Sequence, residues 1–215
     1  LAGASGYSFK EWKGTFYPQD LRPDGMLAWY SERLPTVEIN NTFYRMPKTA
    51  MLESWAATTP ADFRFSIKAS RRITHLARLK VDSVADPLQF LYRTLAALGD
   101  KRGPVLFQLP PFLKQDLPRL GEFLQLLPAG HQAAFEFRHD SWFDDDVYSL
   151  LSGAGAATFN ANKAFRKPIA PVSVSALKKT QPTITTSRVY RCGQRGHAPG
   201  PSGCEDPAIC RSENF

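Results

Sequence analysis

Cysteine is absent from the first 191 residues. The three cysteines of the chain, Cys192, Cys204 and Cys210, lie near its C-terminus, and no two of them have the CxxC spacing. A secreted domain held together by disulfides would distribute its cysteines through the fold, so this placement favours a cytoplasmic protein. With His197 the thiols form only a loose set of metal ligands, and their spacing does not favour a zinc site.

Long apolar runs are also missing. No stretch approaches the ~20 apolar residues of a membrane helix, and the N-terminus has no basic segment followed by an apolar one. The sequence therefore predicts neither a membrane span nor a signal peptide. It begins at Leu1 without a methionine, which suggests a fragment.

Nucleotide-binding motifs are absent as well. Neither GxGxxG nor GxxxxGK[ST] occurs, so dinucleotide and P-loop functions have no support. The net charge of +7 comes mostly from residues 163–215, which contain nine Lys and Arg against three acids. Residues 1–162 contain 18 Lys and Arg against 17 acids and are nearly neutral, so the net charge alone does not indicate a nucleic-acid partner.

The 215 residues are 43% hydrophobic and 12% aromatic, which is enough material for one large core. We expect a body over residues 1–162 and a divergent tail over residues 163–215, because the tail is basic, contains the cysteines and has no amphipathic helix. We expect this tail to be an altered end of the chain, for example one produced by a shifted reading frame.

Strand and helix patterns alternate along the body. Strands are predicted near residues 1–5, 36–40, 63–69, 105–109, 133–138 and 156–160, and helices near residues 27–34, 51–59, 87–98, 117–127 and 144–152. Asp86 is the predicted N-cap of the third helix, with Pro87 in its first turn. Short connections between these elements favour parallel βα units and a TIM-type (β/α) barrel, incomplete or irregular at its C-terminal end.

Polar side chains interrupt four of the predicted strands. Val37 and Ile39 alternate with Glu38 and Asn40, and the same alternation recurs around residues 64–70, 105–110 and 134–138. A sheet covered on both faces favours continuous apolar runs, whereas a barrel mouth accepts polar residues that point inward. We therefore expect the carboxyl ends of these strands to converge on one site.

The candidate site residues share a place on strand ends or on the loops that follow. The candidates for acid–base chemistry are Glu38, Glu136, His75 and His139, and the candidates for ligand binding are Tyr7, Trp12, Asn40, Tyr44, Lys68, Arg71, Gln108, Arg138 and Trp142. Aromatic rings beside charges suit a sugar, a base or a phosphorylated small molecule. Asp140 is expected to orient His139.

Three functional hypotheses remain open. The first is an enzyme of the hydrolase or isomerase type, in which Lys68 and Arg138 bind an anionic group; the two carboxylates also allow a glycosidase. The second is a nucleic-acid-binding module that uses the basic rim of Arg45, Lys68, Arg71, Arg72 and Arg138. The third is a noncatalytic barrel with a structural polar layer. A divalent metal is possible but unsupported, and neither a cofactor nor an oligomeric state is predicted.

The chain resembles the domain-of-unknown-function 72 family, also called YecE-like. The segments that carry the resemblance, in order, are residues 6–8, 11–14, 16–18, 37–45, 63–68, 72–75, 107–111 and 136–142. The resemblance covers roughly residues 3 to 160 and implies a TIM-type barrel, but it implies no reaction. After about Asn162 the chain departs from the family pattern.

Overall fold

The computed structural model describes residues 1–159 and 188–189. The strands are β1 (Ala2–Ala4), β2 (Thr36–Ile39), β3 (Arg64–Lys68), β4 (Arg102–Gln108), β5 (Ala133–Glu136), β6 (Ala157–Phe159) and β7 (Arg188–Val189). The α-helices are α1 (Met26–Ser31), α2 (Thr49–Thr58), α3 (Val81–Leu95), α4 (Leu117–Gln125) and α5 (Asp145–Gly153). The predicted alternation of strand and helix is thus confirmed. The predicted boundary at residue 162, the three cysteines and His197 lie outside the described residues.

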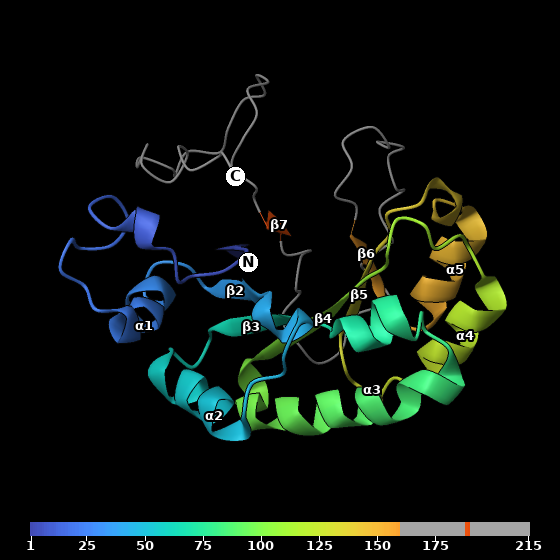
Figure 1. Cartoon of the computed structure of the whole chain (residues 1–215), viewed down its shortest axis with the longest axis horizontal. Coiled ribbons are helices and arrows are strands. Elements are labelled where there is room, and N and C mark those ends of the chain that lie inside the picture. Colours follow the sequence, from blue (N-terminus) through green and yellow to red (C-terminus); the bar gives the residue numbers. More distant parts are fainter. Residues whose placement is uncertain (160–187, 190–215) are drawn as a thin grey trace, which may run out of the picture.

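The strands form one sheet in the order β6-β5-β4-β3-β2-β1-β7, and every pair of neighbours is parallel. Strands β1 to β6 curl, and helices α1 to α5 follow one another around their outer side (Figure 1). The described residues therefore form a parallel α/β half-barrel, and a complete TIM barrel is not shown. None of the helices in this part of the chain is both long and apolar enough to cross a membrane.

The hydrophobic core lies between the strands and the helices. Val37, Phe65, Ile67, Phe107 and Phe135 are fully buried, and the register places Val37 beside Phe65 and Phe107 beside Phe135. Because side chains alternate along a strand, the residues between them point to the other, inner face of the sheet. That inner face carries polar side chains, as the interrupted strand patterns predicted.

Tyr30 of α1 fixes the first two strands together. Its hydroxyl donates a hydrogen bond to the carbonyl oxygen of Thr36 at 2.9 Å and accepts one from the amide of Ala4 at 2.7 Å. Burial raises the pKa of Tyr30 to about 12, so the phenol stays protonated and can donate. At Gly3 a Cβ atom would lie 2.0 Å from the carbonyl oxygen of Thr36, so only glycine allows this close approach of β1 and β2.

The predicted start of the third helix is wrong. Helix α3 begins at Val81 instead of after Asp86, and Pro87 lies inside it. Val84 is fully buried and extends the apolar stripe of Leu88 and Leu91 backwards by one turn. Burial of this additional turn outweighs the hydrogen bond that Pro87 cannot donate to the carbonyl of the residue four positions earlier.

Replacing Pro87 with alanine restores an N–H group inside α3. We expect the free energy of unfolding to rise by about 1–2 kcal/mol. A proline inside a helix destabilises the folded state by about 3 kcal/mol, but it also restricts the unfolded chain, which offsets part of that loss. Urea denaturation of the variant and the wild type measures the difference.

Pro118→Ala is the matched control. Pro118 lies in the first turn of α4, where a backbone N–H has no acceptor within the helix. We expect no stabilisation there, and an equal response of the two variants would contradict a helix that begins at Val81.

Candidate functional site

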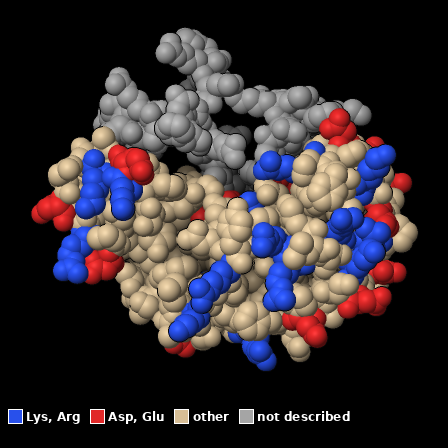
Figure 2. Space-filling model, viewed as in Figure 1, with Lys and Arg blue, Asp and Glu red and all other residues tan. Residues whose placement is uncertain are grey.

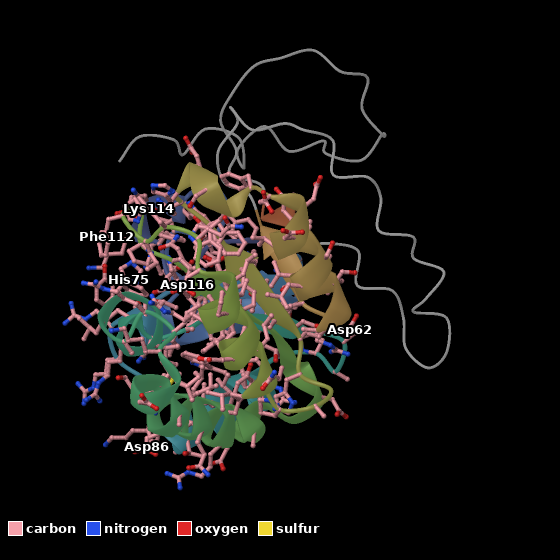
Figure 3. The ribbon with its side chains drawn as sticks, turned by 90° about the vertical axis from the view of Figure 1, so that its right-hand side faces the viewer. Asp62, His75, Asp86, Phe112, Lys114 and Asp116 are labelled. Carbon is pink, nitrogen blue, oxygen red and sulfur yellow. The ribbon has the colours of Figure 1, made fainter. Side chains whose placement is uncertain are left out.

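The candidate site lies at the carboxyl ends of the parallel strands. Figure 3 places His75, Phe112 and Lys114, which lie on loops after β3 and β4, on one side of the molecule, and Asp62, which precedes β3, on the opposite side. The side of His75 is the face that points toward the viewer in Figure 1. Loops at this end of a barrel carry the functional residues in TIM-type proteins.

Glu136 is the buried centre of the inner face, with only 3% of its surface exposed. Gln108 lies beside it on the neighbouring strand and donates from Nε2 to Oε2 at 2.7 Å. Arg138 donates to Oε1 from Nε at 2.8 Å, and its Nη2 forms an ion pair with the same oxygen at 2.7 Å. Burial of an unpaired carboxylate costs several kcal/mol, so these contacts are needed to keep the charge inside the sheet. Three of the predicted site residues, Gln108, Glu136 and Arg138, are thus in contact with one another.

Glu38 belongs to a second group at the ends of β1 and β2. Asn40 donates from Nδ2 to Oγ of Ser5 at 2.5 Å, and Ser5 donates to Oε1 of Glu38 at 2.9 Å. Sequence reasoning selected Glu38 and Asn40 but missed Ser5. The available signal was its position one residue after the first strand, on the same face as the polar residues of the second strand.

Lys68 ends β3 and His75 follows it, and in the sheet β3 lies between β2 of the Glu38 group and β4 of the Glu136 group. The ammonium of Lys68 is 5.2 Å from the ring centroid of Phe43, and the His75 ring packs edge-on against Phe43 with centroids 4.9 Å apart. Burial lowers the pKa of His75, and the charges of Lys68 and Arg138 lower it further. His75 is therefore neutral at neutral pH and can accept a proton. Lys68 and Arg138 are therefore near enough to the His75 ring to act on its pKa.

His139 has a local structural contact that the sequence did not predict. Its Nδ1 accepts a hydrogen bond from the backbone N–H of Ser141 at 3.1 Å and lies 2.9 Å from Oγ of the same serine. The imidazole thereby caps the short helical turn Asp140–Trp142. Ser141, and not the predicted Asp140, orients this ring in the structure.

The structure does not place Trp142 at the rim. The indole is 1% exposed, donates from Nε1 to the carbonyl oxygen of Leu113 at 2.7 Å and stacks on Phe137 with ring centroids 4.8 Å apart. The turn that begins at His139 directs this large apolar side chain into the core, where its N–H has a partner. A ligand at the mouth cannot contact it, so the expectation of a ligand-binding Trp142 is wrong for this structure.

Tyr7 and Trp12 belong to a cluster of aromatic rings that packs against α1. The Trp12 ring packs against Phe9, Phe16 and Tyr17 at centroid distances of 4.7–5.9 Å. Tyr7 is half-buried with its ring near Tyr30 and Trp55, and burial raises its pKa. These contacts give the loop a packing role, and a role in ligand binding stays a prediction.

Tyr44 and Arg71 are exposed at the rim, as predicted. The Tyr44 side chain is 73% exposed and touches only one ring among the described residues, that of Phe43 at 5.0 Å. Arg71 directly precedes the π-helical turn Arg72–Leu76. Both side chains therefore face solvent at the carboxyl end of the sheet, outside the Glu136 group.

Metal ligands are not concentrated in this part of the chain. Within residues 1–159 and 188–189, no three His, Cys, Asp or Glu side chains come close enough together to hold a metal ion.

The described sheet, with helices on its outer side and polar side chains at the carboxyl ends of its strands, is that of a TIM-like α/β protein. The sequence model described as "Protein of unknown function DUF72" matches residues 1–200, and the chain belongs to this family. The match extends past residue 162, where we expected the family resemblance to end.

Curated relatives match part of the chain. The UPF0759 protein YecE of Escherichia coli (strain K12) is 34% identical over 119 residues, which are 54% of this chain and 43% of that protein. The UPF0759 protein YunF of Bacillus subtilis (strain 168) is 28% identical over 141 residues, which are 62% of this chain and 50% of that protein. The chain thus spans about half the length of these relatives.

Solved structures of the family have the same fold. A DUF72 family protein of Thermotoga maritima MSB8 superposes with a TM-score of 0.64 and 28% identity, over 73% of this chain and 62% of that one. A DUF72 family protein of Enterococcus faecalis V583 gives a TM-score of 0.60 at 18% identity, over 73% and 58%. The second likeness bears on the fold alone, and neither protein's description states a ligand or a reaction.

Replacing His75 with glutamine removes a group whose pKa is lower in the folded chain than in the unfolded chain. As the pH falls through about 6.5, the unfolded chain takes up this proton first, and the free energy of unfolding of the wild type decreases. We expect the variant to lose less stability than the wild type between pH 7.5 and 5, as measured by thermal denaturation. Parallel pH dependences would show that His75 has no lowered pKa.

Proposed function

We propose that the inner face of the half-barrel binds a phosphorylated or sugar-like small molecule and acts on it as a hydrolase or an isomerase. The observation that carries this proposal is the packing of Lys68 and His75 around the ring of Phe43, at the end of the strand next to the group of Arg138 and the buried Glu136. The charges of Lys68 and Arg138 both lower the pKa of His75 and so favour its neutral form. An anionic group would bind to the cations, and the imidazole would serve as the base.

Arg138 is the best-placed residue for an anionic group. A guanidinium has five N–H donors; in Arg138, Nε donates to Glu136 and Nη2 forms an ion pair with it. The Arg138 side chain is 40% exposed while that of Glu136 is 4% exposed, so the remaining donors face the mouth. Its planar fork is suited to two parallel hydrogen bonds with a phosphate or a carboxylate.

Glu136 acts in this proposal through Arg138. Both of its carboxylate oxygens already accept hydrogen bonds, from Gln108 and Arg138. It therefore positions the guanidinium, while His75 and the partly exposed Glu38 are the groups able to exchange a proton with a ligand. Glu38 receives one hydrogen bond from Ser5 at Oε1, which keeps the carboxylate on the inner face.

Arg138→Lys tests the binding of an anionic group. Calorimetric titration would use glucose 6-phosphate, fructose 6-phosphate, ribose 5-phosphate and inorganic phosphate, each sugar phosphate paired with its unphosphorylated sugar. We expect binding that depends on the phosphate, and a loss of about tenfold in affinity in the variant, because lysine keeps the charge but loses the two-pronged contact.

Arg64→Lys is the matched control, since Arg64 begins β3 and its guanidinium contacts backbone carbonyls at the amino end. It should leave affinity unchanged. Failure of the three sugar phosphates and of inorganic phosphate to bind, or equal effects of the two variants, would contradict the proposal.

Glu136→Gln separates a ligand site from a structural polar layer. The amide keeps one oxygen to accept from Arg138 but loses the charge, so we expect a modest decrease in the free energy of unfolding together with weaker binding of the phosphorylated probes. Urea denaturation and calorimetric titration of the same preparation measure both. A change in stability with unchanged binding would favour the noncatalytic barrel.

A further inference from the structure

Positive charge is concentrated on three consecutive loops at the mouth. Residues 40–48, 69–80 and 109–116 contain seven Lys and Arg and a single acid, whereas residues 1–162 as a whole contain 18 and 17. All seven basic side chains are exposed. The single acid, Asp116, caps α4 and pairs with Arg119 at 2.8 Å, so its charge is already compensated. These loops therefore form a basic surface on a nearly neutral body.

The charge distribution is visible on the face that carries the mouth. Figure 2 shows Lys and Arg over the middle and right of this face with few acids among them, and a further group at its left edge beside Asp and Glu. Figure 3 shows His75, Phe112 and Lys114 together at the same end of the molecule. A surface of this kind attracts polyanions.

Exposed aromatic rings lie among these cations. Tyr44 is 73% and Phe112 is 61% exposed, on the loops that follow β2 and β4. Tyr44 packs edge-on against Phe43, which also contacts the His75 ring at 4.9 Å. The guanidinium of Arg78 lies 5.2 Å from the centroid of Phe112. Rings left open to solvent on loops at the same end of the sheet indicate a binding surface.

The loop between the aromatic rings is held in a fixed and strained conformation. The π-helical turn Arg72–Leu76 is followed by two left-handed residues, Arg78 with φ 52° and Leu79 with φ 63°. Neither is glycine, and side chains other than glycine are strained in this conformation. Burial of Leu79 and Ile73 anchors the loop and offsets this strain. The anchored backbone presents Arg78 beside Phe112.

The loop after β2 is fixed to its neighbour as well. The hydroxyl of Thr42 is 2.7 Å from the carbonyl oxygen of Lys68 and 2.9 Å from that of Ile39, so it joins the ends of β2 and β3. Tyr44 follows two residues later and is therefore carried on a tethered turn. Fixed aromatic rings lose little conformational entropy when a ligand stacks on them.

We propose that this basic and aromatic rim, made of Tyr44, Arg71, Arg72, Arg78, Phe112 and Lys114, binds single-stranded nucleic acid. Unpaired bases would stack on Tyr44 and Phe112, and the phosphates would contact the arginines and the lysine. A duplex offers its phosphates but not its base faces, so the two aromatic rings specify the single strand. The rim excludes Lys68, Glu136 and Arg138, so this inference does not depend on the function proposed for the inner face.

Fluorescence anisotropy with labelled twelve-nucleotide oligothymidylate tests the proposal on the full 215-residue chain. Four phosphate contacts predict a slope of about −3 for log affinity against log salt, at about 0.7 per contact. We expect Tyr44→Ala and Phe112→Ala each to weaken binding about tenfold without a change in that slope, because they remove stacking and not charge. The double variant R71A/R72A should make the slope shallower by about 1.4.

Phe90→Ala is the matched control. Phe90 is also an exposed ring with an arginine over it, since Arg93 lies 5.9 Å from its centroid, but both residues belong to helix α3. Every variant keeps residues 163–215 and their net positive charge, so a contribution of these residues to affinity is the same in Phe90→Ala and in Phe112→Ala. We expect Phe90→Ala to bind like the wild type.

Three outcomes would overturn the proposal. The first is that the oligonucleotide does not bind at 50 mM salt. The second is that Phe90→Ala and Phe112→Ala lose the same affinity. The third is that a twelve-base-pair duplex binds as tightly as the single strand and that Tyr44→Ala does not change its affinity. Sedimentation with phosphatidylserine vesicles provides the contrast with a membrane surface. Binding to vesicles that Tyr44→Ala and R71A/R72A weaken, without binding to the oligonucleotide, would assign the rim to lipid and also overturn it.

Discussion

Side chains alternate between the two faces of a strand, and the remaining features of this half-barrel depend on that constraint. The outward positions carry residues such as Phe65, Phe107 and Phe135, which bury their rings against the helices. The inward positions of the same strands are then separated from the helices. Because the strands are all parallel, their carboxyl ends lie at one edge, and the inward polar residues Lys68 and Glu136 reach that edge together.

Burial of Glu136 requires the neighbouring side chains on the inner face to be in contact with it. An isolated carboxylate would be too costly there, so Gln108 from the next strand and Arg138 from the same chain segment must accompany it. Arg138 in turn affects His75 on another loop by lowering its pKa. A change at any one of these positions therefore alters the charge environment of the others.

The strands and helices could be predicted because each depends on a local pattern. The alternation around Glu38, the stripe through Leu88 and the acids at the start of α5 all gave the right elements, and Asp144 does accept a hydrogen bond from Asp146. Asp86 was predicted to be the N-cap of α3 because proline is favoured in the first turn of a helix. The helix begins five residues before Asp86, at Val81, because Val84 is buried against residues distant in sequence. The burial of Trp142 depends on a contact distant in sequence, with Leu113, which no local pattern contains. Ser5 could have been found only by pairing the first strand with the second and comparing their faces.

His75 connects the inner face to the rim. Its ring packs on Phe43, which also contacts Tyr44, while its pKa responds to Lys68 and Arg138. An anion bound between these two cations would offset the charges that lower this pKa, and would therefore favour the imidazolium form. By thermodynamic linkage, protonation of His75 would strengthen anion binding to the same extent. The proton on His75 and an anion on the inner face are thus linked, at a ring that packs on the same phenylalanine as Tyr44 of the rim.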